Sequence, residues 1–223
     1  MGFLDDLKRQ AEEAKARIDN DNSQLERNTA LADAALKAAA AYLSTLMHQL
    51  NVLRPRSKTT YRLDKRNAFA DLQMTDFRTD ARRKRLRGKD VHDHTSLRWR
   101  LNSGTKLQLV KDFPPDIEQL ESRLRRGGVQ FQAETVRDPD TNKLRQIRYD
   151  FTADFEAAVN INADHDAAKL RFEIINLDGL ELVTVEFMAI EVGNGRMDDL
   201  ARWIMGEPSG FLKGGRALRR VEA

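Results

Sequence analysis

The fold is decided by residues 129–191, which read VQFQAETVRDPDTNKLRQIRYDFTADFEAAVNINADHDAAKLRFEIINLDGLELVTVEFMAIE. Apolar residues recur at every second position, as at Val129, Phe131 and Ala133. Alternation with a period of two is typical of β-strands that have one buried face. The segment therefore predicts an antiparallel meander of strands joined by turns.

Turn residues divide this meander at 138–142 and at 164–166. Asp178-Gly179 stands between two apolar runs and predicts a tight hairpin, because both central residues of such a turn need a positive φ. The last strand, residues 180–190, is apolar on both faces, which is typical of a strand that is covered on both sides. We therefore expect a helix to pack on the sheet there.

Composition sets the outer limits of the interpretation. The chain has 223 residues, of which 33% are charged and 40% are hydrophobic, enough for one large domain or a domain with an appendage. Cysteine is absent, which excludes disulfides and thiol chemistry. No signal-peptide pattern follows Met1, and the most apolar stretch, residues 30–53, is interrupted by Asp33 and Lys37. We expect a cytoplasmic protein without a transmembrane segment.

Residues 3–53 have the spacing of a long helix. Residues 19–23 are poor in helix formers, and Ser23 with Glu26 has capping-box spacing, so we expect a second helix to start there. Apolar residues are separated alternately by three and four positions in both halves, which places them on one stripe of a helix. The first half of the stripe holds Leu4, Leu7, Ala11, Ala14 and Ile18; the second holds Leu25, Thr29, Ala32, Leu36, Ala39, Leu43, Leu46 and Leu50.

Two interpretations of this stripe remain open. In one, it packs on the protein's own sheet or on the other half of the helix. In the other, it mediates self-association or partner binding through a coiled coil, with an association seam formed by Leu25, Ala32, Leu36, Ala39, Leu43, Leu46 and Leu50.

The complete pattern predicts an α+β fold. A helical arm, residues 1–53, precedes an antiparallel β-rich domain, residues 54–205, with a curved sheet of seven to nine strands and two short helices. Pro55 ends the arm, because the residue before a proline disfavours the helical conformation. Residues 206–223 form a basic tail that we expect to be extended or loosely docked.

The densest charge signal lies in residues 82–89, with six positive charges and no acid. Such a run can attract phosphate oxygens, and a nearby tryptophan could stack on a base. The predicted anion-binding set is Arg82, Arg83, Lys84, Arg85, Arg87, Lys89, Arg98, Trp99 and Arg100. The alternative is a solvated strand edge whose charges are neutralised by Asp71, Asp76, Asp80, Asp90 and Asp93.

His92 and His94 form a second candidate. On a regular strand they project from the same face, close enough to share a metal ion. A third ligand would come from His165, Asp164 or Asp166. The alternative is a pair of partly exposed polar histidines without a metal.

The sequence contains no nucleophile elbow and no glycine-rich phosphate loop after a strand, so enzyme activity is not favoured. The functional hypothesis is a non-enzymatic binding or scaffolding protein that needs no cofactor. Its N-terminal helix associates with itself or a protein partner, and its basic loop meets a nucleic acid or an anionic membrane surface. One alternative is a metal-dependent enzyme using His92 and His94. Another is a carrier with an apolar pocket between sheet and helix, lined by Phe131, Tyr149, Phe151, Phe155, Phe172 and Phe187.

Overall fold

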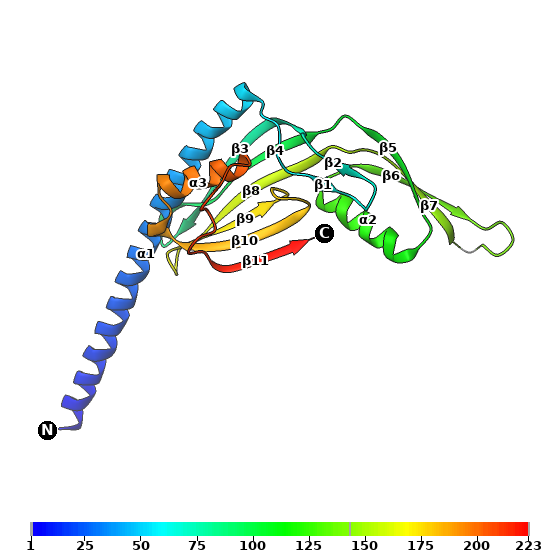
Figure 1. Cartoon of the computed structure of the whole chain (residues 1–223). Helices are drawn as coiled ribbons and strands as arrows, with labels where there is room; N and C mark the ends of the chain where they lie inside the picture. Colours follow the sequence, from blue (N-terminus) through cyan, green and yellow to red (C-terminus); the bar gives the residue numbers. More distant parts are fainter. Residues whose placement is uncertain (1, 143, 223) are drawn as a thin grey trace.

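The computed structural model describes residues 2–142 and 144–222, so Met1, Lys143 and Ala223 lie outside the described residues. Helix α1, Phe3–Leu53, is one straight element (Figure 1). The expected second start at Ser23 is wrong, because residues 19–23 continue the helix. The Ser23 hydroxyl donates to the Asp19 carbonyl, 2.9 Å away, so it is satisfied inside the helix rather than capping a new one.

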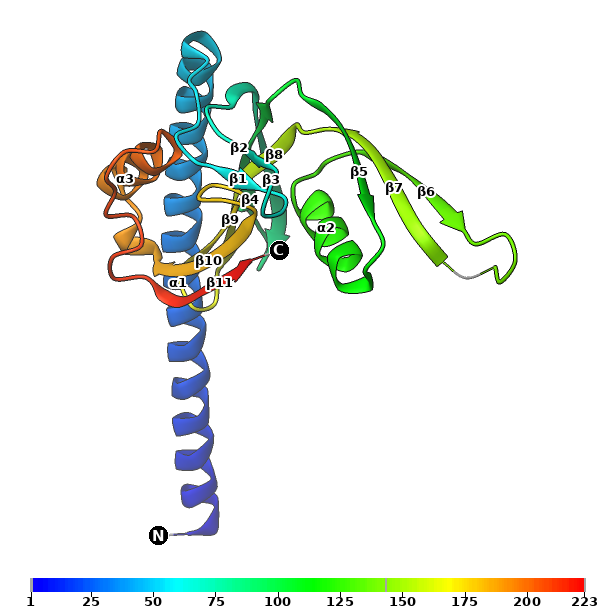
Figure 2. The same cartoon turned by 45° about the vertical axis from the view of Figure 1, so that its right-hand side comes forward.

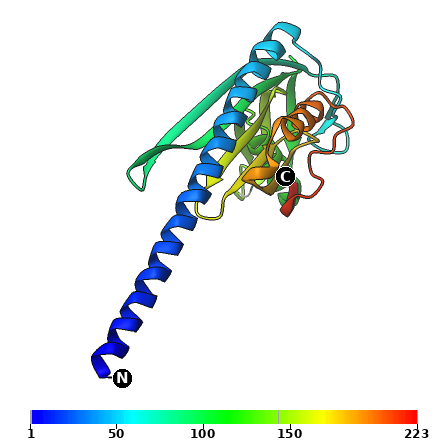
Figure 3. The same ribbon diagram turned by 90° about the vertical axis from the view of Figure 1, so that its left-hand side faces the viewer.

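The second half of α1 packs on the main sheet. Ala32, Leu36, Ala39, Leu43 and Leu50 are all at most 2% exposed and face the protein's own core. Most of the association seam therefore packs inside the protein's own chain, as in the first interpretation of the stripe. Its other two members, Leu25 and Leu46, are half-buried. The first half of α1 extends beyond the sheet (Figure 3). Among the described residues, none of the helices combines the length and the apolar character needed to cross a bilayer.

The main sheet confirms the predicted α+β class with antiparallel strands. In the described part of the chain it has six strands in the order β11-β10-β9-β8-β4-β3, and every neighbouring pair is antiparallel. Their bounds are β3 Gln73–Leu86, β4 Lys89–Asn102, β8 Phe155–Asp164, β9 Lys169–Ile175, β10 Glu181–Met188 and β11 Arg216–Glu222. Alternate residues such as Leu97, Val159 and Phe172 form the buried face beneath α1.

The meander is divided between two sheets rather than forming one. β5, Lys106–Lys111, and β6, Phe131–Arg137, flank β7, Leu144–Thr152, in a smaller sheet that projects from the body (Figure 2). Helix α2, Pro114–Arg126, lies beside it, and the Tyr149 hydroxyl donates to Glu121 of α2 at 2.9 Å. A two-stranded ladder, β1 Tyr61–Arg62 with β2 Ala68–Phe69, completes the strands of the described residues.

The C-terminal segment was expected to be extended or loosely docked; part of it is an extended strand, but the segment is anchored to the body. After the short turn η1, Ala189–Glu191, helix α3, Asn194–Ile204, lies beside α1 (Figure 1). Phe211 is 1% exposed, and its ring centre lies 5.2 Å from that of Phe172. β11 then pairs with β10 at the edge of the main sheet. The buried Phe211 ring and the β10–β11 ladder together anchor this segment, although its composition is that of a basic tail.

Replacing Leu43 by alanine is expected to lower the free energy of unfolding by about 2–5 kcal/mol, because it leaves a cavity in the core beneath α1. Leu43 is fully buried, whereas Leu31 on the same helix is 46% exposed. Leu31→Ala is therefore the matched control, with a change within about 0.5 kcal/mol. Urea unfolding followed by circular dichroism measures both. Equal effects at the two positions would contradict the packing of α1 on the sheet.

Candidate anion-binding cleft

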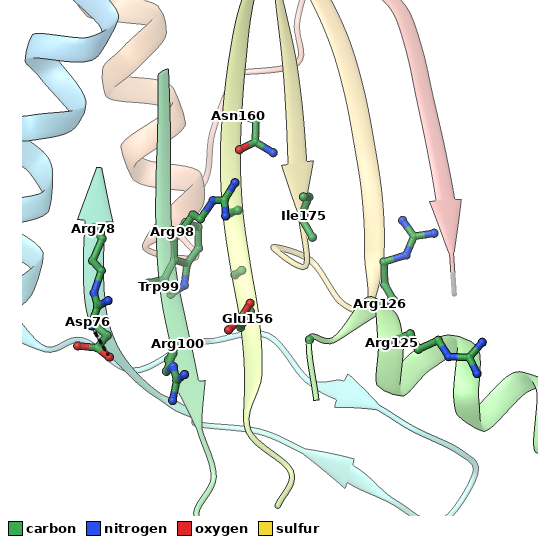
Figure 4. A pocket seen from close by; sticks show the side chains of 13 residues that line it. Asp76, Arg78, Arg98, Trp99, Arg100, Arg125, Arg126, Glu156, Asn160 and Ile175 are labelled. Carbon is green, nitrogen blue, oxygen red and sulfur yellow. Dashed lines mark ion pairs between the residues drawn. The ribbon is translucent and has the colours of Figure 1, made fainter. Parts of the chain in front are cut away.

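A cleft of about 440 Å³ lies on the face of the main sheet opposite the α1 core (Figure 4). This volume is within the range of about 300–1,000 Å³ that small-molecule sites occupy. The charged side chains that line it come from β3, β4, β8 and the end of α2. They are Asp76, Arg78, Arg98, Arg100, Arg125, Arg126 and Glu156.

Strand alternation puts three of the arginines on one face. Arg98 and Arg100 are two positions apart on β4, so they share the face opposite to the buried Leu97 and Leu101. Arg78 of β3 lies directly across from Arg98. Like charges placed opposite each other destabilise a sheet, so this arrangement favours an anion that would lie between them.

A β-bulge aims the β3 side chains into the cleft. Thr75 pairs with Arg100 and Arg78 with Arg98, so β3 has one more residue than β4 in this interval. Asp76, within the bulge, has a φ of 60°. The Asn51 side chain of α1 donates to the Phe77 carbonyl at 2.9 Å and accepts from the Phe77 N–H at 3.1 Å. The end of α1 thereby holds the bulge that presents Asp76 and Arg78.

The end of α2 is held against β8 by Asn176. Its side-chain amide donates to the carbonyls of Arg126 and Glu156, each at 2.7 Å, and the Glu156 N–H donates to the Gly127 carbonyl at 2.7 Å. A Cβ at Gly127 would lie 2.7 Å from the Phe155 ring, so only glycine permits this close approach. These contacts bring the end of α2, with Arg125 and Arg126, to the edge of the cleft on the far side of β8 from the β4 arginines (Figure 4).

Positive charge is in excess in the cleft, with five arginines against two acids. Arg78 pairs with Asp76 at 3.5 Å, and Arg125 pairs with Glu121 at 2.6 Å. Within residues 2–142 and 144–222, the side chains of Arg98, Arg100 and Arg126 have no ion pair. A guanidinium group offers up to five N–H donors in a planar fork that matches phosphate and carboxylate oxygens. Chemically, the site is suited to holding an anion.

Trp99, predicted as a base-stacking residue, is 2% exposed. Its ring stacks on Phe77 with the ring centres 5.7 Å apart. It therefore supports the floor of the cleft from the core side and is not at the surface where a base would reach it.

The basic run 82–89 forms the hairpin between β3 and β4, where its charges are largely paired with neighbouring acids. Arg82 lies 3.1 Å from Asp80, and Lys84 lies 2.6 Å from Asp93. The Arg83 guanidinium donates to the carbonyl of Asp90 at 3.0 Å. This arrangement corresponds to the neutralised strand edge that was the alternative interpretation of the run.

The tip of the same hairpin is tied to α1. Arg87 pairs with Asp166 and donates to the Thr29 hydroxyl at 2.6 Å. Lys89 lies 3.8 Å from Glu26. In the described part of the chain, Arg83 and Arg85 are the cations of the run without an ion pair, and Arg83 keeps its hydrogen bond to the Asp90 carbonyl. The run is therefore partly used in docking the hairpin onto the helix.

The two candidate metal ligands have separate partners. The Nδ1 atom of His92 lies 2.8 Å from the Asp33 carboxylate of α1, whereas that of His94 lies 2.9 Å from the Asn162 side chain of β8. Arg82 pairs with His94 and Arg83 with His92, which leaves Asp93 as the extra residue of a bulge. The bulge changes the alternation, so the two histidines do not share a face as a regular strand would require.

The proposed third ligands do not complete a site either. His165 is 3% exposed, and its Nε2 lies 3.0 Å from the His92 carbonyl. Asp164 accepts from the backbone N–H groups of Asp166 and Ala167 within its turn. Among the described residues, no group of three or more metal-ligating side chains is close enough to hold an ion.

Sequence reasoning found Arg98 and Arg100 but not the site as a whole. Their alternation on a strand is visible in the sequence, whereas the approach of Arg125 and Arg126 depends on tertiary contacts through Asn176. The role of Asn51 has no sequence signal, because an asparagine near a helix end is ordinary. Comparison with models of known families, with curated proteins and with solved structures found no match, so the geometry carries the functional argument.

Replacing Asp33 by alanine is expected to destabilise the protein at neutral pH by about 1–3 kcal/mol, since it removes the acceptor of two half-buried groups of His92, the backbone N–H and Nδ1. Burial raises the pKa of Asp33, but hydrogen bonds from His92 and the positive charge of its ring lower it by more, to below the ordinary value of 3.8. A carboxyl with a lowered folded-state pKa stabilises the fold above its unfolded-state pKa of about 3.9. That stabilisation is lost as the pH falls through the lower, folded-state value.

The difference in unfolding free energy between wild type and Asp33→Ala should therefore be complete at pH 7 and shrink below about pH 4. Urea titrations at a series of pH values measure it. Asp19→Ala, at an exposed position of the same helix, serves as the control. A difference that grows on acidification would contradict the assigned role of the carboxylate.

Proposed function

We propose that this protein is a non-enzymatic binding protein whose cleft holds the phosphate group of a ligand. The observation that supports the proposal is that one cleft is lined by Arg98, Arg100 and Arg126, which lack ion pairs among the described residues. Unpaired guanidinium groups close together repel one another, and an anion relieves that repulsion. Two or more arginines can grip one phosphate through several charge-assisted hydrogen bonds.

The two acids of the cleft narrow the ligand class. Asp76 and Glu156 supply carboxylate oxygens beside the arginines. Ionised carboxylates only accept hydrogen bonds, so they favour a ligand that also carries hydroxyl or amino groups. A phosphorylated sugar or a nucleotide combines both kinds of group, whereas a simple inorganic anion does not use the acids.

The cleft is a better candidate for this role than the hairpin. Most charges of residues 82–89 already have partners within the chain, as Lys84 has in Asp93. A cation that is already paired gains less from a new anion, and exposed pairs are screened by salt. A carrier of apolar ligands receives no such support, because the aromatic residues pack on each other, as Tyr61 and Phe155 do at 5.5 Å.

The double substitution Arg98→Gln with Arg100→Gln is expected to weaken binding of inorganic pyrophosphate by at least about tenfold, because a hydrogen bond to a charged group contributes about 1.5–3 kcal/mol. Isothermal titration calorimetry at physiological salt measures the dissociation constants. A nucleotide that binds more tightly than pyrophosphate would support the role of Asp76 and Glu156 as acceptors.

The matched control removes the same number of charges from the hairpin. Arg82→Gln with Arg85→Gln should change the affinity less than about twofold, since charges beyond a Debye length of about 8 Å are screened. Equal losses in the two variants would refute the cleft as the site. If the hairpin substitutions weaken binding of a single-stranded oligonucleotide and the cleft substitutions do not, the anion-binding role belongs to residues 82–89 instead.

Asn51→Ala tests whether the bulge positions Arg78 and Asp76. It is expected to weaken pyrophosphate binding about three- to tenfold without touching the cleft, because the supporting hydrogen bonds to Phe77 are lost. Asn28→Ala is the control, since Asn28 also bonds a backbone carbonyl, that of Asp166, but lies far along the same helix. If both variants retain wild-type affinity while remaining folded, α1 has no part in shaping the site.

A further inference from the structure

Residues 3–24 of α1 project beyond the main sheet (Figure 2), and this half of the helix carries exposed apolar side chains. Phe3 is 77% exposed, Leu4 78%, Leu7 44% and Ile18 59%. Large apolar side chains gathered on one side of an exposed element mark an interaction surface. The partner can be identified from the direction and the pattern of this stripe.

The exposed stripe continues the buried one. At about 100° per residue, the centre of the Leu4–Ile18 stripe lies within about 40° of the centre of the Ala32–Leu43 stripe. The latter packs on the main sheet, and α1 is straight between them (Figure 3). The exposed stripe therefore faces the side on which the body of the protein lies.

The side to which the exposed stripe faces excludes a membrane or another flat surface as the partner. A helix that lies on a membrane sinks its apolar face into the lipid headgroups. Here the body projects on that same side, so a flat surface in contact with Leu7 and Ile18 would collide with the sheet. A helix, about 10–12 Å across, is narrow enough to fit in the angle between the free half of α1 and the end of the sheet.

The order of large and small residues along the stripe is symmetric, as is required of a surface that pairs with a second copy of itself. Leu7, Ala11, Ala14 and Ile18 are separated by four, three and four positions, so large-small-small-large reads the same in both directions. A two-fold axis between Ala11 and Ala14 would place Leu7 of each copy opposite Ile18 of the other. The two alanines would face each other and permit close approach of the helices. Such self-complementarity is what an isologous interface requires.

We propose that residues 3–24 of two copies of this chain pair antiparallel about that axis. The free half is about 33 Å long, so the tip of each helix would end beside residues 21–25 of the other copy, where its sheet begins. Lys8 of one copy meets Lys15 of the other on one flank, a contact between like charges that opposes pairing; Glu12, one turn from each lysine in its own helix, offsets part of this repulsion. The pairing is independent of the arginine cleft, which lies on the opposite face of the sheet.

Cysteine cross-linking tests the pairing and its direction, because the chain contains no cysteine of its own. Ala11→Cys and Ala14→Cys are prepared as separate full-length variants and mixed under mild oxidation. Antiparallel pairing predicts that the mixture gives mainly the mixed disulfide, since a disulfide needs Cα atoms within about 7 Å. Parallel pairing predicts that each variant cross-links with itself instead.

Sedimentation equilibrium gives the second measurement. Wild type should sediment as a dimer, and Leu7→Glu with Ile18→Glu should give a monomer that remains folded, with a cooperative urea transition, because both residues are exposed in the single chain. Ala16→Glu, on the opposite side of the same helix, should remain dimeric. A monomeric wild type at high micromolar concentration, a preference for self-cross-links, or binding of the wild-type monomer to lipid vesicles would overturn the proposal.

Discussion

The packing of the second half of α1 on the main sheet is the contact on which the rest of the structure depends. Leu36, Leu43 and Leu50 are inserted into the core beneath the strands, and burying a leucine contributes about 1.5–3 kcal/mol. Helix α1 extends past this contact with the main sheet at both of its ends. Its C-terminal end reaches the bulge of β3 through Asn51, and its N-terminal half projects into solvent. One anchored element thus determines the shape of the cleft and the direction of the free stripe.

The cleft illustrates how a sheet can hold charges that repel one another. Arg78 of β3 and Arg98 of β4 lie directly opposite each other on neighbouring strands, an arrangement that costs stability. The strands cannot relax away from it, because their opposite faces carry Phe77 and Trp99, whose rings stack in the core. Asn176 fixes α2 on the other side with two hydrogen bonds. Packing on one face therefore keeps the guanidinium groups of the other face in place.

Periodicity in the sequence was sufficient to predict the class of fold, and single-residue irregularities explain most of what it missed. The alternation of residues 129–191 appears in the structure as antiparallel strands, although they are divided between two sheets, and most of the apolar stripe of residues 25–50 is buried against the main sheet. Two bulges, at Thr75/Arg78 and at Arg82/Arg83, change which side chains share a face. A bulge adds one residue and leaves no mark in composition, so the separation of His92 from His94 could not be foreseen. Arg98 and Arg100 were found because regular alternation holds there, whereas the position of α2 depends on contacts made by distant residues.

The free half of α1 needs an explanation that its sequence alone does not provide. Isolated helices shorter than about 12–15 residues are marginal in water, and even longer ones obtain most of their stability from packing. Residues 3–24 lie beyond the sheet and include the weak helix formers Asp19, Asn20, Asp21 and Asn22. Their helix is an extension of the anchored half, which supplies the nucleus that an isolated helix must form unaided. Extension removes the cost of nucleation but leaves Leu4, Leu7 and Ile18 in water. An apolar stripe that needs no packing to form, and gains free energy only when it is covered, is best explained by a partner that covers it.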